Sequence, residues 1–375
     1  MPSLTGHIVS PQGLQPATLH FGSHIHAVHS ASAAQASYYL LPGFIDTHVH
    51  GGGGGDTMDG ADGVLTLAKT HLQHGTTTLY PTTMTNPWDT ILAALQGVQE
   101  VQTAQAQAAL QEPIAEVAGV HLEGPFISPN RLGAQPPYSL EPNPEQLETL
   151  LSFGIIRLVT LAAEVAGAEA AAQCFARAGV RVSLGHSNAS YEQCQRIADS
   201  VQQAGGTLGF THLYNAMSGL QGRAPGVLGA AFANAQSYAE IILDGHHLHV
   251  GSVRAAYQAK PGHISLISDA IRASALGDGD SELGGQPVTV RQGRAQLADG
   301  TLAGSVLTLD QALRHALEAD FTLCQASAML SAVPARYMGL SDRGELSLGK
   351  RADIVVLDKA YKLEQVYLAG RACLP

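Results

Sequence analysis

The chain has 375 residues, of which 45% are hydrophobic, and this suits a large core in a soluble globular protein. A formal net charge of -11 argues against nucleic acid or an anionic membrane surface as a partner, since both require basic patches. The four cysteines show no CxxC spacing, which excludes a zinc knuckle and a CxxC redox motif. Because the first residues lack the features of a signal peptide and no apolar run reaches membrane-spanning length, we expect a cytoplasmic protein.

Both ends of the chain are predicted to form short strands. Residues 1–41 contain three such segments and the C-terminal tail two more, at 6–9, 17–21, 25–28, 353–358 and 365–370. We expect them to pair into a small β-sandwich domain built from residues 1–41 and 341–375. Five histidines of the N-terminal part are expected to be solvated strand residues without a functional role: His7, His20, His24, His26 and His29.

Residues 42–340 alternate short apolar strands with helical stretches, a pattern typical of βα units. Eight strands are predicted, at 44–50, 76–81, 117–123, 155–162, 181–186, 207–214, 239–244 and 263–269. Helices are expected between them, for example at 89–110, 166–178 and 191–204. This predicts an α/β (β/α)8 TIM-like barrel, in which the chemistry lies at the C-terminal ends of the strands. An open doubly wound sheet is disfavoured because no GxGxxG motif follows the first strand.

The first predicted barrel strand ends in two histidines, His48 and His50, followed by the glycine run Gly51–Gly55. Side chains alternate along a strand, so the two imidazoles point to the same face. Two imidazoles at a strand end can share a divalent metal, and the glycines allow close approach of backbone or substrate. Taken alone, the motif leaves open a pair of surface histidines before a flexible loop.

Further strand ends carry Glu123, His186, His212 and Asp269. Each has a structural alternative: a buried carboxylate, a hydrogen-bonded core histidine or a helix cap. Their coincidence at the mouth of one barrel favours a functional site.

A carboxylate and two neutral imidazoles leave one tetrahedral position for water, so Glu123, His186 and His212 are predicted to hold a metal. The metal lowers the pKa of that water and yields a hydroxide nucleophile. Asp269 can take the water's proton and return it to a leaving amine. The two histidines of the first strand, together with Asp269, are expected to hold a second ion or to orient the water. A His/carboxylate site suits zinc, iron, cobalt or manganese, and affinity order alone does not select among them. We expect Zn or Fe, with one or two ions per subunit.

Longer motifs around these residues carry a family resemblance over nearly the whole chain: Pro42–Asp46, His121–Phe126, Gly185–Ser187, Thr211–Met217 and Ser268–Ala270. The chain resembles the N-acetylglucosamine-6-phosphate deacetylases of the amidohydrolase superfamily, and residues 344–355 look like that superfamily's return into the small β domain. The segments HLEGPF and THLYNAM are far more specific than the HxH pair. The resemblance implies hydrolysis of N-acetyl-D-glucosamine 6-phosphate to D-glucosamine 6-phosphate and acetate, a step of amino-sugar catabolism.

By the same resemblance Glu123, His186 and His212 are ligands of the main metal and Asp269 is the general base and acid. Some members replace the HxH pair and work with one metal. This chain keeps both histidines, so a two-metal site is predicted, with Glu123 bridging the ions.

Substrate contacts follow from the resemblance as well. Asn215 and Ala216 are expected to meet the sugar or its phosphate. The segment around Arg223 resembles the one whose arginine binds the 6-phosphate, often across a dimer interface, so a homodimer with a shared Arg223 is expected. An arginine fork suits a phosphate better than a lysine does.

Two further substrate contacts are less regular. The segment Asp244–His249 has three histidines where the family has one; His247 fits the spacing best, and His249 is the alternative. Gln135 stands where the family often has a substrate-contacting histidine. Glutamine can still donate a hydrogen bond, but it cannot carry a charge.

Two rival functions fit the sequence less well than this one. Dihydroorotases and hydantoinases use a carboxylated lysine at the end of strand four, and residues 155–162 contain no lysine. A non-catalytic scaffold is the second rival, but abandoned metal chemistry normally leaves lost ligands, and every expected position is filled here.

Overall fold

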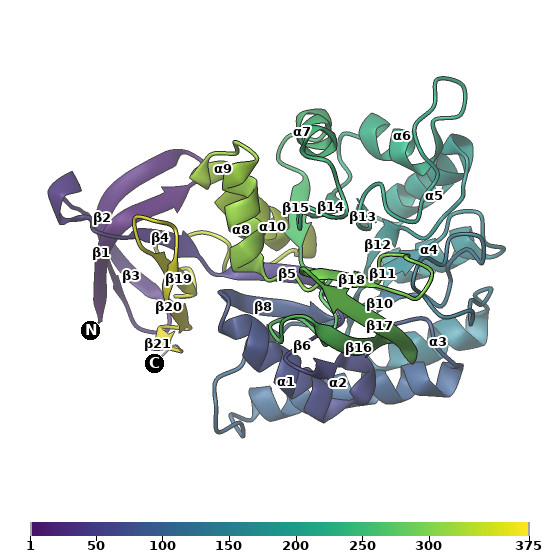
Figure 1. Cartoon of the computed structure of the whole chain (residues 1–375), viewed down its shortest axis with the longest axis horizontal. Helices are drawn as coiled ribbons and strands as arrows, with labels where there is room; N and C mark the ends of the chain where they lie inside the picture. Colours follow the sequence, from purple (N-terminus) through teal and green to yellow (C-terminus); the bar gives the residue numbers. More distant parts are fainter. Residues whose placement is uncertain (1, 374–375) are drawn as a thin grey trace.

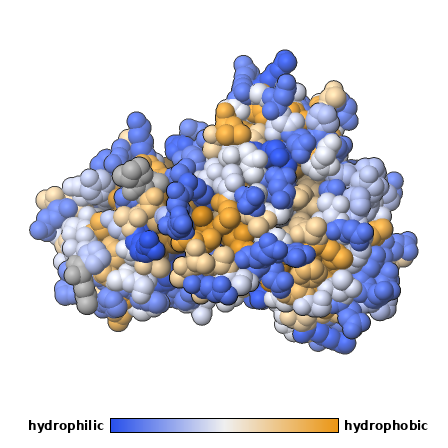
Figure 2. Space-filling model, turned by 90° about the horizontal axis from the view of Figure 1, so that it is seen from below, coloured by the Kyte–Doolittle hydropathy of each residue, from blue (hydrophilic) through white to orange (hydrophobic). Residues whose placement is uncertain are grey.

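The computed structural model describes residues 2–373 and has two visibly different parts (Figure 1). A sheet that contains both ends of the chain lies on the left of the view. A larger body of strands and helices lies to its right, with α8 and α10 near the boundary. On the face seen in Figure 2 most of the surface is hydrophilic and hydrophobic side chains gather in smaller areas.

The terminal sheet has seven strands in the order β21-β20-β19-β4-β1-β2-β3. Their bounds are β1 Ser3–Ser10, β2 Gly13–Phe21, β3 Ile25–Ser30, β4 Tyr39–Pro42, β19 Ile354–Leu357, β20 Leu363–Leu368 and β21 Arg371–Ala372. Strand β4 joins the two ends, because it pairs parallel with β1 and antiparallel with β19. Alternating side chains from both ends, such as Leu19, Leu40 and Ile354, share one buried cluster. The predicted pairing of the two termini is thus present.

The body contains parallel strands at the predicted places, with bounds within a few residues of the prediction. They are β5 Phe44–Val49, β8 Thr76–Pro81, β9 Glu116–Val117, β10 Val120–Glu123, β11 Ile156–Leu161, β12 Arg181–Leu184, β13 Leu208–Phe210, β14 Ala239–Ile242 and β15 Ile264–Ile267. Parallel pairing links β5-β8-β9, β10-β11-β12-β13 and β14-β15. The backbone also connects these sheets: Thr82 bridges to His121, and Phe210 N donates to Tyr238 O at 3.0 Å. Beyond the end of β15, Asp269 N donates to His48 O at 2.9 Å, which ties the last strand to the first.

Helices alternate with these strands. They are α1 Ala61–Leu72, α2 Trp88–Ala106, α3 Pro144–Ser152, α4 Ala168–Arg177, α5 Tyr191–Gln203, α6 Gly226–Ala233, α7 Val250–Ala259, α8 Leu309–Glu318, α9 Leu323–Ser327 and α10 Val333–Met338. Helix α5 begins at a capping box in which Ser190 and Gln193 satisfy each other's backbone N–H groups. Its buried face repeats at helical spacing, as at Cys194, Ile197 and Val201, and packs on the main core. No helix within residues 2–373 is long and apolar enough to cross a membrane.

A three-stranded antiparallel sheet between β15 and α8 was not predicted. It consists of β16 Gly279–Leu283, β17 Gln286–Arg291 and β18 Arg294–Gln296. Gly284 and Gly285 make the first turn with φ of 58° and 80°, a left-handed conformation that glycine adopts without strain. Leu283 and Val288 pack in a cluster with Met84 and Ala134, so this sheet covers segments beside the site. The Gly-Gly pair between two alternating runs was the available sequence signal.

Candidate metal centre and substrate cavity

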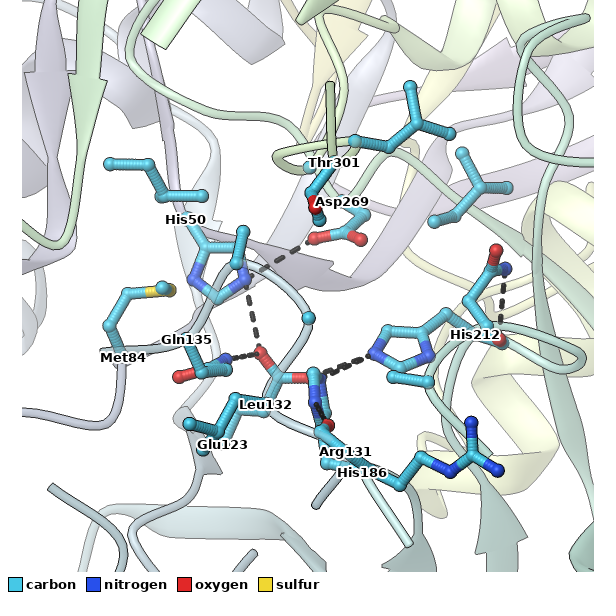
Figure 3. A pocket seen from close by; sticks show the side chains of 18 of the residues that line it. His50, Met84, Glu123, Arg131, Leu132, Gln135, His186, His212, Asp269 and Thr301 are labelled. Carbon is cyan, nitrogen blue, oxygen red and sulfur yellow. Dashed lines mark hydrogen bonds and ion pairs between the residues drawn. The ribbon is translucent and has the colours of Figure 1, made fainter. Parts of the chain in front are cut away.

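The strand ends of the body bring the six predicted metal-site side chains together in a buried cluster, and Figure 3 labels five of them, all except His48. Each follows or closes a parallel strand, and each is less than a tenth exposed: His48, His50, Glu123, His186, His212 and Asp269. This confirms that the sequence motifs converge, because parallel strands of such units end on the same side. Their donor atoms form two groups, His48/His50/Asp269 and Glu123/His186/His212, each with atoms within 4.8 Å of one another.

Glu123 lies between the two groups and presents one oxygen to each. Its Oε1 is 3.2 Å from Nε2 of His186 and 3.2 Å from Nε2 of His212. Its Oε2 is 3.2 Å from Nε2 of His50 and 3.5 Å from Nε2 of His48. A carboxylate in this position can bridge two cations.

Asp269 completes the group around the two histidines of β5. Its Oδ1 is 3.3 Å from Nε2 of His50 and 3.4 Å from Nε2 of His48. The side chain of Asp269 is 10% exposed and that of Glu123 is 2% exposed, so Asp269 is the more accessible of the two carboxylates. It can therefore contact both a cation held by the histidines and a molecule that approaches from solvent.

The hydrogen bonds of the histidines decide which ring nitrogens face the cluster. Nδ1 of His50 contacts Thr82 O at 3.1 Å, and Nδ1 of His186 contacts Arg131 O at 2.9 Å. A carbonyl only accepts, so these Nδ1 atoms carry the proton and a neutral ring keeps its Nε2 lone pair free. The Nε2 atoms then face other acceptor atoms. For example, Nε2 of His48 lies 3.2 Å from Nε2 of His50. Such converging acceptors fit a divalent cation in each group.

Burial and neighbouring charges shift the pKa values of His48 and His50 in this cluster. Burial lowers the pKa of His50, but hydrogen bonds and charges from Asp269 and Glu123 outweigh burial and raise that pKa to about 9. The pKa of His48 is likewise raised, by the charges of Glu123 and Asp269. Positive charge between these buried carboxylates is therefore favoured, whether a proton or a metal ion supplies it.

Three of these residues have strained backbones. His186, His212 and Asp269 have φ of 46°, 27° and 47°, in the left-handed region that non-glycine residues seldom adopt. Each such residue costs about 1–3 kcal/mol, and such strain clusters at functional sites. All three residues lie just past the ends of their strands, at the point where their side chains join the cluster.

Glu240 is a buried carboxylate that the sequence analysis missed. It lies in β14, where its Oε2 accepts from Nδ1 of His48 at 3.2 Å and its Oε1 accepts from Thr47 Oγ1 at 2.7 Å. A carboxylate behind a ligating histidine fixes the ring's tautomer and orientation. The only sequence signal was a single acidic residue inside the four-residue apolar strand Ala239–Ile242.

Five of the six cluster residues, all except His48, line a cavity of about 390 Å³, a size suited to a small molecule. Asn215, Ala216 and His247, all predicted to bind substrate, line it. Nδ1 of His247 bonds Asp244 Oδ2 at 2.7 Å. Burial would raise the pKa of Asp244, but bonds from His247 lower it to about 2, so Asp244 stays ionised and orients the ring. His249, the alternative, accepts from Gly251 N at the start of α7 and is not a lining residue.

A family model for amidohydrolases matches residues 39–373, which is most of the chain. The chain belongs to the amidohydrolase family. It is 39% identical to an N-acetylglucosamine-6-phosphate deacetylase of Lysinibacillus sphaericus, over 93% of this chain and 89% of the relative. It is 38% identical to an N-acetylgalactosamine-6-phosphate deacetylase of Escherichia coli O157:H7, over 88% of this chain and 87% of the relative.

A solved structure agrees with these relatives. An N-acetyl-D-glucosamine-6-phosphate deacetylase mutant of Mycobacterium smegmatis, in complex with N-acetyl-D-glucosamine-6-phosphate, superposes with a TM-score of 0.90 at 33% identity. The match covers 100% of this chain and 99% of the other. The resemblance seen in the sequence motifs is therefore confirmed.

In this amidohydrolase Arg223 does not line the cavity above the cluster. It lines a neighbouring hollow, together with Arg131, Asn188 and Ser218. Arg131 belongs to both hollows, and its guanidinium donates to Asn188 Oδ1 at 2.8 and 3.0 Å. Arg131 is thus a cation at the cavity that sequence reasoning missed, because no motif distinguished it from a surface arginine.

Gln135 lines the cavity, as predicted, but its amide is engaged with the protein. Its Nε2 donates to Glu123 Oε2 at 2.7 Å (Figure 3), and its Oε1 accepts from Thr85 N at 2.7 Å. Gln135 therefore contacts the carboxylate that lies between the two groups.

Proposed function

We infer that this amidohydrolase removes the acetyl group from N-acetyl-D-glucosamine 6-phosphate to give D-glucosamine 6-phosphate and acetate. The observation that carries this inference is Glu123, which faces two candidate cation groups at the floor of a cavity of about 390 Å³. Relatives at 39% identity over most of the chain are deacetylases of this substrate. The reaction class, hydrolysis of a linear amide, is the same for these relatives.

We also propose a more detailed fold, a closed barrel with a small β domain. The hydrogen bonds between consecutive parallel strands, and from the last strand back to the first, support a closed (β/α)8 barrel over residues 42–340. Residues 1–41 and 341–375, of which residues 1, 374 and 375 lie outside the described structure, are the proposed small β domain. The chemistry would lie at the C-terminal mouth of the barrel, as it does in such enzymes.

The proposed ligands are Glu123, His186 and His212 for the main ion, with His48 and His50 at the second. A divalent cation there, with Zn or Fe as the proposed metal, would polarise the amide carbonyl and lower the pKa of water. Glu123 supplies the anionic charge that both groups share.

Asp269 is proposed as the general base and acid. Its carboxylate accepts a proton from the water whose oxygen adds to the acetyl carbon. As the carbon–nitrogen bond breaks, Asp269 returns that proton to the sugar nitrogen, which leaves as an amine while acetate is released. Its position between the histidines of β5 and the cavity supports both steps.

The rest of the cavity would bind the sugar and its phosphate. Asn215, Ala216 and His247 line it and are proposed contacts. Arg223 is proposed to act on the cavity of a partner subunit in a homodimer. Its position outside this chain's own cavity is consistent with such sharing.

N-acetyl-D-galactosamine 6-phosphate is a second candidate substrate, because a deacetylase of that sugar is 38% identical to the chain. Metal analysis of the purified protein, with deacetylation assays on both phosphorylated sugars and on unphosphorylated N-acetylglucosamine, tests the proposal. We expect metal-dependent release of acetate and a higher kcat/KM for the glucosamine compound. Release of acetate from neither phosphorylated sugar would reject the proposed function.

A further inference from the structure

Gln135 lies between the backbone of Thr85 and the carboxylate of Glu123. Both of its hydrogen bonds are 2.7 Å long, and the residue is 6% exposed. The family resemblance implies that Gln135 contacts the sugar. The two bonds point instead to a role within the protein.

The backbone bond fixes which way round the Gln135 amide lies. The N–H of Thr85 only donates, so the amide atom beside it must be the oxygen Oε1. The NH2 group must then face Glu123, whose Oε2 accepts from it. The neutral amide thus holds one chosen oxygen of Glu123 in place.

That oxygen is the one directed at the histidines of β5. Oε2 of Glu123 is 3.2 Å from Nε2 of His50, whereas Oε1 faces His186 and His212. A donor on Oε2 restrains rotation of the carboxylate and occupies one of that oxygen's lone pairs. The oxygen that faces the other group carries no such bond from Gln135.

We propose that Gln135 is a positioning residue that holds Oε2 of Glu123 toward the His48/His50/Asp269 group and thereby sets the affinity of the ion bound there. This rests on the proposed two-ion site. Partners behind metal ligands typically change metal affinity by about 10- to 100-fold when they are removed. The effect is expected mainly at this group, because the other group uses the oxygen that Gln135 does not touch.

The test is a titration of metal-free protein with Zn²⁺ in the absence of substrate. Calorimetry measures the binding, and the metal content is determined after dialysis. Gln135→Met keeps the length of the side chain and removes the donor, and we expect the second ion to bind about 10- to 100-fold more weakly. A His48→Asn/His50→Asn background, which leaves Glu123, His186 and His212, should lose most of this sensitivity to Gln135→Met.

Gln286→Ala is the matched control. Gln286 Nε2 donates to Ala134 O at 2.7 Å, so its removal loosens the same segment without touching Glu123. We expect Zn²⁺ binding like that of the wild type. If both variants bound Zn²⁺ equally weakly, the specific role of Gln135 on Glu123 would be overturned. The effect would then come only from loosening of this loop.

Other outcomes also decide the matter. Unchanged Zn²⁺ binding with a raised KM in Gln135→Met would show that Gln135 binds the substrate instead, and would overturn the proposal. Wild-type protein that binds a single ion would overturn the assigned site without affecting the deacetylase function. Conversely, the expected Zn²⁺ result with no acetate released from either sugar would reject the function and keep the role of Gln135.

Discussion

The imidazole of His48 donates from Nδ1 to Oε2 of Glu240 across 3.2 Å, and both side chains are almost completely buried. This bond reaches from β14 to β5, two strands far apart in the sequence. It leaves Nε2 of His48 directed at Glu123 and Asp269. Glu240 therefore determines which His48 nitrogen a cation can use.

Glu240→Gln should weaken the ion at the His48/His50/Asp269 group, because the amide removes the anionic acceptor behind the ring. We expect about a 10- to 100-fold loss of affinity for that ion and little change at the other group. Zn²⁺ titration of the metal-free protein measures both. Thr47→Val is the control: it removes one bond to Glu240 but keeps the carboxylate, so its effect should be smaller. Wild-type affinity in Glu240→Gln would contradict this role.

The convergence of these six side chains could be predicted because each lies near the end of a strand, within a recognisable motif. His186 and Asp269, for example, lie two residues beyond the last residues of β12 and β15, and the architecture brings such strand ends together. Glu240 could not be found in this way, since its importance comes from a partner on a different strand. The position of Arg223 outside the cavity could not be predicted either, because short motifs do not determine the conformation of a loop.

Asp269→Asn should lower kcat by at least about 10²-fold, the low end for positioned proton transfer, while substrate binding survives. The amide keeps the shape of the carboxylate but cannot accept the proton. Steady-state kinetics with N-acetylglucosamine 6-phosphate gives kcat and KM separately. Metal content must be measured alongside, because Asp269 Oδ1 lies 3.3 Å from Nε2 of His50. A normal kcat with a raised KM would identify Asp269 as a binding residue instead.

Asp310 offers a pH-dependent contribution to stability away from the site. Burial would raise its pKa, but bonds from His74 and Thr308 and the charge of Arg314 lower it. A carboxyl group with a lowered pKa stabilises the fold above its unfolded value, about 3.9, and loses that contribution as the pH falls below it.

Asp310→Asn should therefore lower the free energy of unfolding at pH 7, with a difference from wild type that shrinks as the pH falls toward and below about 4. Urea unfolding at several pH values measures this difference. Glu318→Gln, an exposed change on the same helix, should have little effect at any pH. A difference for Asp310→Asn that does not vary with pH would attribute its effect to packing.

The 6-phosphate is remote from the bonds that change, so it supplies binding energy that holds the acetyl group in place. Arg223→Ala should therefore remove most of the preference for phosphorylated over plain N-acetylglucosamine, measured as kcat/KM for both sugars. Equal values for the two sugars in the wild type would overturn the phosphate requirement.

Mixing Arg223→Ala chains with Asp269→Asn chains tests whether the arginine is shared across a dimer. A hybrid dimer would contain one complete site, made of Asp269 from one subunit and Arg223 from the other. After full exchange about a quarter of wild-type activity should return, because half of the dimers are hybrids with one working site each. A mixture of Glu123→Gln with Asp269→Asn is the control, since both residues act in the same chain's cavity and no hybrid is complete. If subunit exchange is verified and no activity returns, Arg223 does not act across the interface.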